Sequence, residues 1–136
     1  MNEFEVTSFL ADSVEASEGK IYALGIGWNK IQVQKFPAKH SRIGLGVLIN
    51  VPFTETNKEH SIQVSLVDED GNLFNNIRIQ SQFKLGRPPQ LDDGESQIVP
   101  FAVNFDGLVF EKPTKYRWVI EIDGQIVNGI SMKVGA

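Results

Sequence analysis

The amino-acid sequence predicts an all-β fold, an antiparallel β-sandwich of about eight or nine strands with an immunoglobulin-like or Greek-key topology. Apolar and polar residues alternate over most of the chain, which places the apolar ones on one face of each pleated strand. No segment carries the i, i+3, i+4, i+7 pattern of an ordinary helix. Asp-Gly pairs separate several alternating segments, as hairpin turns do. We expect one domain over residues 1–136.

The strands follow from the alternation, which is clearest where Ile43, Leu45 and Val47 fall on one face. Residues 12–20 lack an apolar face and are expected to form a turn. Residues 84–97 contain consecutive prolines, which lack the amide donor that a central strand requires. We expect this segment to cross from one sheet to the other, which favours a sandwich over a barrel. The expected strands cover residues 4–11, 20–28, 30–36, 42–51, 60–68, 73–85, 97–105, 115–123 and 126–134.

Two aromatic residues in the strand over residues 115–123 are expected to be structural. Tyr116 opens this strand after Pro113, and two interpretations of it stay open. Its hydroxyl could return to nearby backbone, as tyrosines do at a corner of immunoglobulin-like sandwiches. It could equally be an ordinary core residue, as we expect for Trp118.

Composition excludes several classes of function. The 136 residues carry 13 Lys and Arg against 17 Asp and Glu, a formal charge of -4, which argues against nucleic-acid binding. There is no cysteine, so disulfides and thiolate chemistry are excluded, and a cytoplasmic location is expected. Glu3 and Glu5 stand where a secretory signal needs positive charge, and no apolar run is long enough to span a bilayer. We expect no cofactor.

The acidic turns raise the question of calcium. No loop has the complete spacing of an EF-hand, because the third ligand and the closing glutamate are missing after Asp70-Gly71. Asp70-Gly71 and Asp123-Gly124 are instead expected to form type I′ hairpin turns. Asp93-Gly94 and Asp106-Gly107 are expected in looser loops. The alternative is a calcium site where acids from separate loops meet at one end of the sandwich, formed by Asp68, Asp70, Asp93, Asp106 and Asp123.

The remaining candidates point to a binding surface and away from catalysis. His40 and His60 are expected to be solvated loop residues, and Ser131 lacks the sequence context of a nucleophile elbow. Aromatic and arginine side chains are the usual anchors of protein interfaces. The binding residues expected on this basis are Trp28, Arg87, Pro88 and Pro89.

Short motifs occur along the chain: Ala11-Asp12, Gly19-Lys20, Leu24-Gly25, Phe36-Pro37-Ala38 with His40, the strand from Val67 to Gly71, and Pro113 and Tyr116 before Asp123-Gly124. These motifs resemble those of a family of small, uncharacterised bacterial all-β proteins, known only as a domain of unknown function. The resemblance covers nearly the whole chain, although Trp28 and residues 84–97 have no counterpart in the pattern. It implies a β-sandwich in a bacterial or phage setting and brings no catalytic residues.

Taken together, these observations predict a non-enzymatic binding or assembly module of bacterial or phage origin. Its expected partner is a protein, and we expect it to bind neither nucleic acid nor membrane. Two alternatives stay open: a calcium- or carbohydrate-binding sandwich that uses its acidic loops, and a structural component of a phage or other assembly. The sequence leaves the oligomeric state open.

Overall fold

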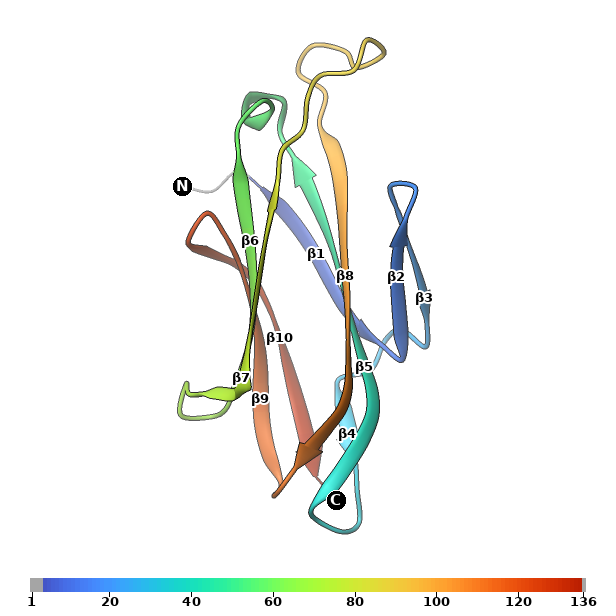
Figure 1. Cartoon of the computed structure of the whole chain (residues 1–136), viewed down its shortest axis with the longest axis vertical. Coiled ribbons are helices and arrows are strands. Elements are labelled where there is room, and N and C mark those ends of the chain that lie inside the picture. The colour runs from blue at the N-terminus through green and yellow to red at the C-terminus, as the bar shows by residue number, and fades with distance from the viewer. Residues whose placement is uncertain (1–3, 136) are drawn as a thin grey trace.

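A computed structural model describes residues 4–135, which form an elongated sandwich of two sheets with an additional hairpin (Figure 1). The predicted domain covered residues 1–136, but residues 1–3 and 136 lie outside the described residues. Glu3, named in the sequence analysis, is one of them. The elements are β1 (Glu5–Ala11), β2 (Ser13–Ser17), β3 (Lys20–Leu24), β4 (Lys30–Gln32), β5 (Ala38–Val51), the 3₁₀ turn η1 (Phe53–Glu55), β6 (His60–Val67), β7 (Leu73–Phe83), β8 (Gln97–Phe110), β9 (Thr114–Ile122) and β10 (Gln125–Gly135).

The smaller sheet has three antiparallel strands in the order β1-β5-β8. Its central strand, β5, is 14 residues long, and Leu45 pairs with Leu10 on one side and with Val103 on the other. The alternating residues Ile43 to Val51 are fully buried, as the sequence predicted. Their burial on one face drives this sheet against the other one.

The larger sheet has five strands in the order β4-β10-β9-β6-β7. Neighbours are antiparallel except β4 and β10, which run parallel. The prediction of an all-β, predominantly antiparallel sandwich is therefore confirmed, with ten strands in residues 4–135 where eight or nine were expected. Across those residues, no helix has the length and apolar character needed to cross a membrane.

The additional strand lies in residues 12–20, where a turn alone was expected. That prediction was wrong, because residues 13–17 form β2 and pair with β3, and the turn is confined to Glu18 and Gly19 at positive φ. Val14 is the buried apolar residue of β2, so the segment has no stripe that sequence periodicity could detect. The expected strand over residues 20–28 ends early, at Leu24.

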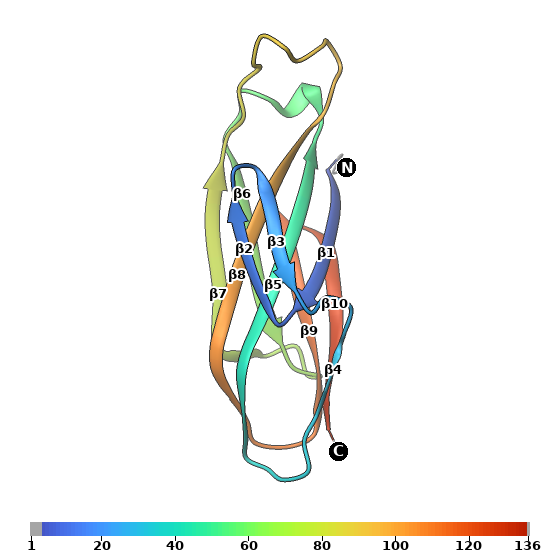
Figure 2. The same cartoon turned by 90° about the vertical axis from the view of Figure 1, so that its right-hand side faces the viewer.

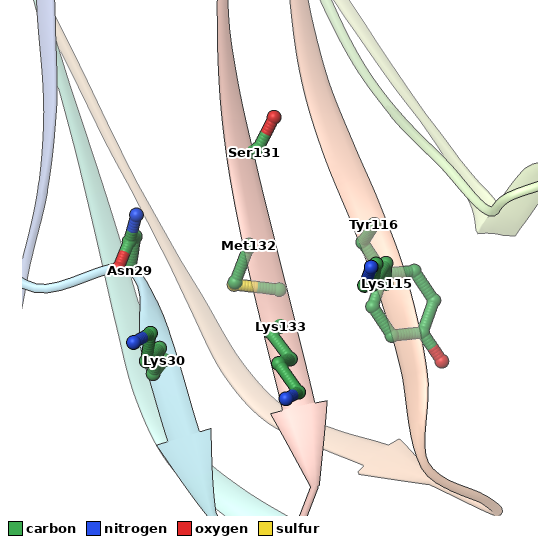
Figure 3. Close-up of a pocket in the computed structure, with 7 residues that line it drawn as sticks. All are labelled: Asn29, Lys30, Lys115, Tyr116, Ser131, Met132 and Lys133. Carbon is green, nitrogen blue, oxygen red and sulfur yellow. The ribbon is translucent and has the colours of Figure 1, made fainter.

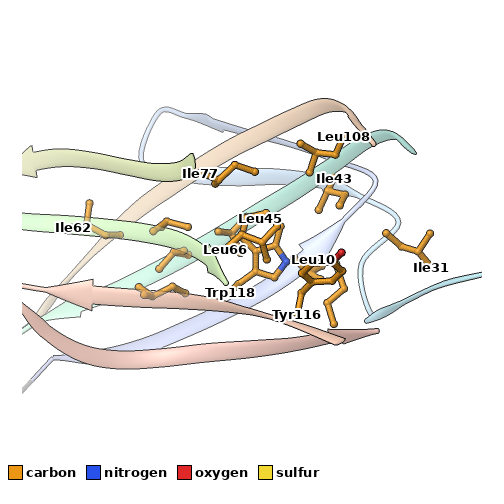
Figure 4. Close-up of a cluster of buried hydrophobic side chains, with 14 of the residues drawn as sticks. Leu10, Ile31, Ile43, Leu45, Ile62, Leu66, Ile77, Leu108, Tyr116 and Trp118 are labelled. Atoms are coloured by element: carbon orange, nitrogen blue, oxygen red, sulfur yellow. The ribbon is translucent and has the colours of Figure 1, made fainter. Parts of the chain in front are cut away.

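The core contains side chains from both sheets (Figure 4). Trp118 is fully buried, and its ring centroid lies 5.0 Å from that of Phe105. Tyr116 is also buried, and its ring lies 5.0 Å from that of Phe74 and 5.4 Å from that of Phe110. Of the two interpretations of Tyr116, the structure therefore shows the core residue. Burial and the charge of Asp68 raise the pKa of Tyr116, despite a hydrogen bond with Thr114.

The four Asp-Gly pairs differ in structure. Asp123 and Gly124 both have positive φ, as a type I′ turn requires, so this prediction is confirmed. Asp70-Gly71 lies at the expected hairpin tip, but only Gly71 has positive φ, and the expected turn type was wrong. Asp93-Gly94 lies in the long connection after β7, as expected. Asp106-Gly107 was expected in a loop but lies within β8, which continues to Phe110.

The Asp70-Gly71 turn departs from type I′ because a side chain organises it. One Asp68 carboxylate oxygen accepts hydrogen bonds from the backbone N–H groups of Asp70 and Asn72, at 2.9 and 3.0 Å. An aspartate that bonds its own following backbone fixes a wider turn than a two-residue loop. The Asp68 side chain therefore has a structural role in this turn.

Candidate functional site

The expected binding residues do not form one site. Trp28 lies between β3 and β4, and its ring is 6.0 Å from that of His40, near the start of β5. Arg87 instead contacts Phe53, which follows the end of β5. Trp28 and Arg87 therefore lie near opposite ends of β5, which is 14 residues long. Trp28 is half-buried beside a depression of about 280 Å³, whose lining also includes Asp12, Lys30, Ile31, Gln32, Val33 and His40.

Arg87 fastens the long connection 84–96 to the 3₁₀ turn. Its Nε donates a hydrogen bond to the Thr56 hydroxyl at 2.6 Å, and its Nη2 donates to the Phe53 carbonyl at 3.2 Å. The guanidinium also lies 3.8 Å from the centre of the Phe53 ring, a cation–π distance. These contacts give Arg87 a structural role, while Pro88 and Pro89 beyond it are exposed.

Replacing Arg87 with alanine is expected to loosen this connection with little effect on the fold. Because the side chain is exposed, we expect the free energy of unfolding to fall by about 1 kcal/mol or less. Proteinase K should, however, cleave the connection several-fold faster, roughly in line with a local opening of that size. Lys84→Ala is the matched control, and equal cleavage of both variants would contradict the assignment.

The acids of the calcium alternative are dispersed. Asp68 and Asp70 lie at the β6–β7 turn, whereas Asp123 lies at the opposite end of β6, where its carboxylate accepts from Ser61 N–H at 2.9 Å. Asp106 pairs with Arg42 at 2.6 Å, and this bond lowers the pKa of Asp106 and raises that of Arg42. Among residues 4–135, no group of three or more His, Asp or Glu side chains is arranged to hold a metal ion.

His60 is buried, so its expected position in a solvated loop was wrong. Its side chain is 4% exposed, at the start of β6, and its ring lies 5.0 Å from that of Phe4 and 5.3 Å from that of Phe83. Nδ1 lies 2.7 Å from an Asp123 carboxylate oxygen, and Nε2 lies 2.8 Å from the Glu55 carbonyl oxygen. No spacing in the sequence indicates this contact, because Asp123 is 63 residues away.

The environment of His60 favours its charged form. Burial lowers the pKa of His60, but the bond to the Glu55 carbonyl, the bond to Asp123 and the charges of both acids outweigh it and raise the pKa. Each ring nitrogen faces an acceptor, so both hydrogen bonds form only when both nitrogens carry a proton. A general base needs one nitrogen free to take a proton from a reacting group. The pair therefore acts as a structural link between β6 and the β9–β10 turn.

Exposed apolar side chains lie on the β2–β3 hairpin and in the residues directly after it. Three neighbouring side chains form what we call the hairpin patch, with exposed fractions of 54% for Tyr22, 73% for Leu24 and 57% for Ile26. Tyr22 and Leu24 project from the same face of β3, opposite Glu15 and Ser13 of β2. Figure 2 shows this hairpin in front of β5 and β8, on the outer side of the smaller sheet. The patch was not predictable from the sequence, because alternation alone does not tell which face of a strand is covered.

A side-chain amide holds the hairpin in this position. Asn104 on β8 accepts a hydrogen bond from Val14 N–H at 3.0 Å and donates one to the Val14 carbonyl at 2.9 Å. Gly44 on β5 permits this approach, because a Cβ there would lie 3.1 Å from Val14 N. Arg42 adds a bond to the Ser13 hydroxyl at 3.2 Å. The hairpin is thus fixed on the sandwich, with its apolar patch facing away from it.

Acidic side chains surround the hairpin patch. Asp12, Glu15 and Glu18 are exposed, and none of them forms an ion pair with any residue that the structure describes. Lys20 is the one cationic side chain within residues 12–24. The patch is therefore apolar at its centre and negative at its border.

Comparison with known proteins agrees with the resemblance seen in the sequence. A family model matches residues 6–135, and its description is a family of unknown function (DUF6941). No curated protein sequence matches the chain.

Proposed function

The chain belongs to the family of unknown function DUF6941, and from this premise we propose that it is a non-enzymatic binding module whose partner is a protein. The observation that carries the proposal is the hairpin patch, in which Tyr22, Leu24 and Ile26 are all more than half exposed. The other large exposed apolar side chains, Ile98, Val109 and Ile126, belong to β8 and β10. A contiguous apolar patch with a polar border is typical of a protein-interaction site.

The chemistry of the patch specifies the kind of partner. Burying Tyr22 and Leu24 requires an apolar segment, and the acids around them favour lysine or arginine on either side of that segment. β3 is bonded to β2 alone among the described strands, so its second edge can accept an extended chain. Main-chain pairing along such an edge is a common mode of peptide recognition. We propose an extended apolar segment with basic flanks as the occupant.

Site-specific photocross-linking tests this proposal in the native host. A benzophenone amino acid in place of Tyr22 should capture a partner that the same label in place of Gln80, exposed on β7, does not capture. The cross-linked segment should be apolar with basic flanks. A synthetic peptide of that segment should bind Leu24→Ser about tenfold or more weakly than the unchanged protein. Ile126→Ser, which removes an exposed isoleucine on β10, is the matched control.

Three results would overturn the proposed partner: a cross-linked segment without apolar residues, equal weakening by both serine variants, or cross-linking to a second copy of the chain. The last result would favour the structural-assembly alternative, and light scattering would then show a mass that grows with protein concentration. A bacterial or phage origin, an immunoglobulin-like topology and a cytoplasmic location stay predictions of the sequence.

The absence of enzymatic activity is part of the proposal. It is supported by the geometry of His60, whose two ring nitrogens both contact acceptors and whose ring packs against those of Phe4 and Phe83. Turnover in a panel of hydrolase substrates that Asp123→Asn abolished would contradict it.

A further inference from the structure

Three lysines lie side by side on the outer face of the larger sheet. Lys133 of β10 is the register partner of Lys30 on β4 and also of Lys115 on β9 (Figure 3). We call these three residues the lysine row. All three side chains are exposed. Because neighbouring strands are about 4.8 Å apart, the row is about 10 Å long. The three lysines are apart in the sequence, and the pairing of β4, β10 and β9 brings them together.

The ammonium groups of the lysine row are not paired with carboxylates among the described residues. Like charges directly opposite one another destabilise a sheet, and in the part of the chain that the structure describes none of the three forms an ion pair. Their shared depression of about 350 Å³ contains no carboxylate and is lined by Asn29, Lys30, Lys115, Tyr116, Ser131, Met132 and Lys133. In a chain with a formal charge of -4, this concentration of positive charge indicates a site for an anion.

The surroundings add a donor, Asn29, at the β4 end of the row, and both a cation, Arg117, and an acid, Glu69, at the β9 end. Arg117 pairs with Ser131 in the next row of the sheet and donates to its hydroxyl at 3.2 Å. The Asn29 amide also lines the depression. The Glu69 carboxylate accepts the backbone N–H of Lys115 at 3.3 Å and borders an adjacent depression of about 390 Å³. Asp12 borders another depression, of about 280 Å³, that Lys30 also lines. An anion is therefore expected nearest to Lys133, the middle lysine of the row, away from both acids.

We propose that the lysine row binds a small anion with two or more linked phosphoryl groups. Lysine ammonium groups act as point charges that suit phosphate oxygens. Two neighbouring ammonium groups can share one phosphoryl group, and three in a row can hold two linked groups. A nucleic acid fits less well, because it needs a longer basic track and exposed aromatic side chains on which bases stack. Near the row, the ring of Trp28 is half-buried and that of Tyr116 is buried, so neither offers an exposed face for stacking. This proposal is independent of the hairpin patch.

Calorimetric titration with pyrophosphate at low ionic strength tests the proposal. The unchanged protein should bind pyrophosphate more tightly than orthophosphate, and Lys133→Gln should weaken pyrophosphate binding about tenfold or more. Lys84→Gln, which makes the same charge change on the β7–β8 connection, should leave the affinity within about twofold. Glu69→Gln should strengthen binding, because it removes a negative charge that contacts the backbone of Lys115.

Thermal unfolding tests whether weaker pyrophosphate binding by Lys133→Gln comes from a folding defect. Without phosphate, Lys133→Gln should unfold at the same temperature or slightly higher, since it relieves repulsion within the row. Pyrophosphate should raise the midpoint of the unchanged protein and not that of Lys133→Gln. Equal weakening by Lys84→Gln would overturn the proposal, and so would unchanged binding by Lys133→Gln. Lys133-dependent binding only to an oligonucleotide or to anionic phospholipid vesicles would also overturn it.

Discussion

Replacing Trp118 with alanine is expected to lower the free energy of unfolding by about 3–5 kcal/mol. The side chain is fully buried among residues of both sheets, and its ring lies 5.0 Å from that of Phe105. Alanine removes most of this contact area and leaves a cavity that two hydrogen-bonded sheets can close only in part. Urea unfolding followed by circular dichroism measures the loss.

Phenylalanine at the same position is the informative control. The Trp118 indole Nε1–H is buried and has no hydrogen-bond partner among the described residues. An unpaired buried donor is itself destabilising, so its removal offsets part of the lost ring volume. We expect Trp118→Phe to stay within about 1.5 kcal/mol of the unchanged protein. A loss as large as that of the alanine variant would show that the indole donor has a partner in solution.

Replacing His60 with glutamine is expected to cost about 2–4 kcal/mol near pH 6, and less at higher pH. The change removes a charged ring that contacts Asp123 and the Glu55 carbonyl. Since the pKa of folded His60 is raised, its stabilisation is fully present below the unfolded pKa of about 6.5. That stabilisation is lost as the pH rises through the folded pKa. The difference in the free energy of unfolding between the unchanged protein and His60→Gln should therefore narrow as the pH rises above the folded pKa of His60.

The measurement is urea unfolding of both proteins at several pH values between about 5.5 and 9, which brackets the ordinary histidine pKa. His40 is present in both proteins, so their difference isolates His60. Asp123→Asn should also make the free energy of unfolding depend less on pH, because it removes the charge that faces Nδ1 of His60. A difference that stays constant across the range would contradict a charged His60.

The larger strands were predictable because each is amphipathic over its own length. Ile43 to Val51 alternate on one buried face, and Trp118 belongs to a similar stripe. β2 was missed because its position depends on Asn104, which lies 90 residues from Val14. The same reason applies to His60 with Asp123 and, in the lysine row, to Lys30 of β4 with Lys133 of β10. In each case the decisive contact joins strands that are distant in the sequence, and local periodicity contains no information about which strands pair.

The way in which the hairpin is fixed has a consequence for how this fold can diversify. Val14, Gly44 and Asn104 hold the hairpin by its inner side and by backbone atoms, and none of these contacts depends on Tyr22 or Leu24. Selection could therefore exchange the outward-facing residues almost freely, while the residues that hold the hairpin stay fixed. Under the binding function that we propose, relatives of this chain would then share one scaffold and differ in the partner that they recognise.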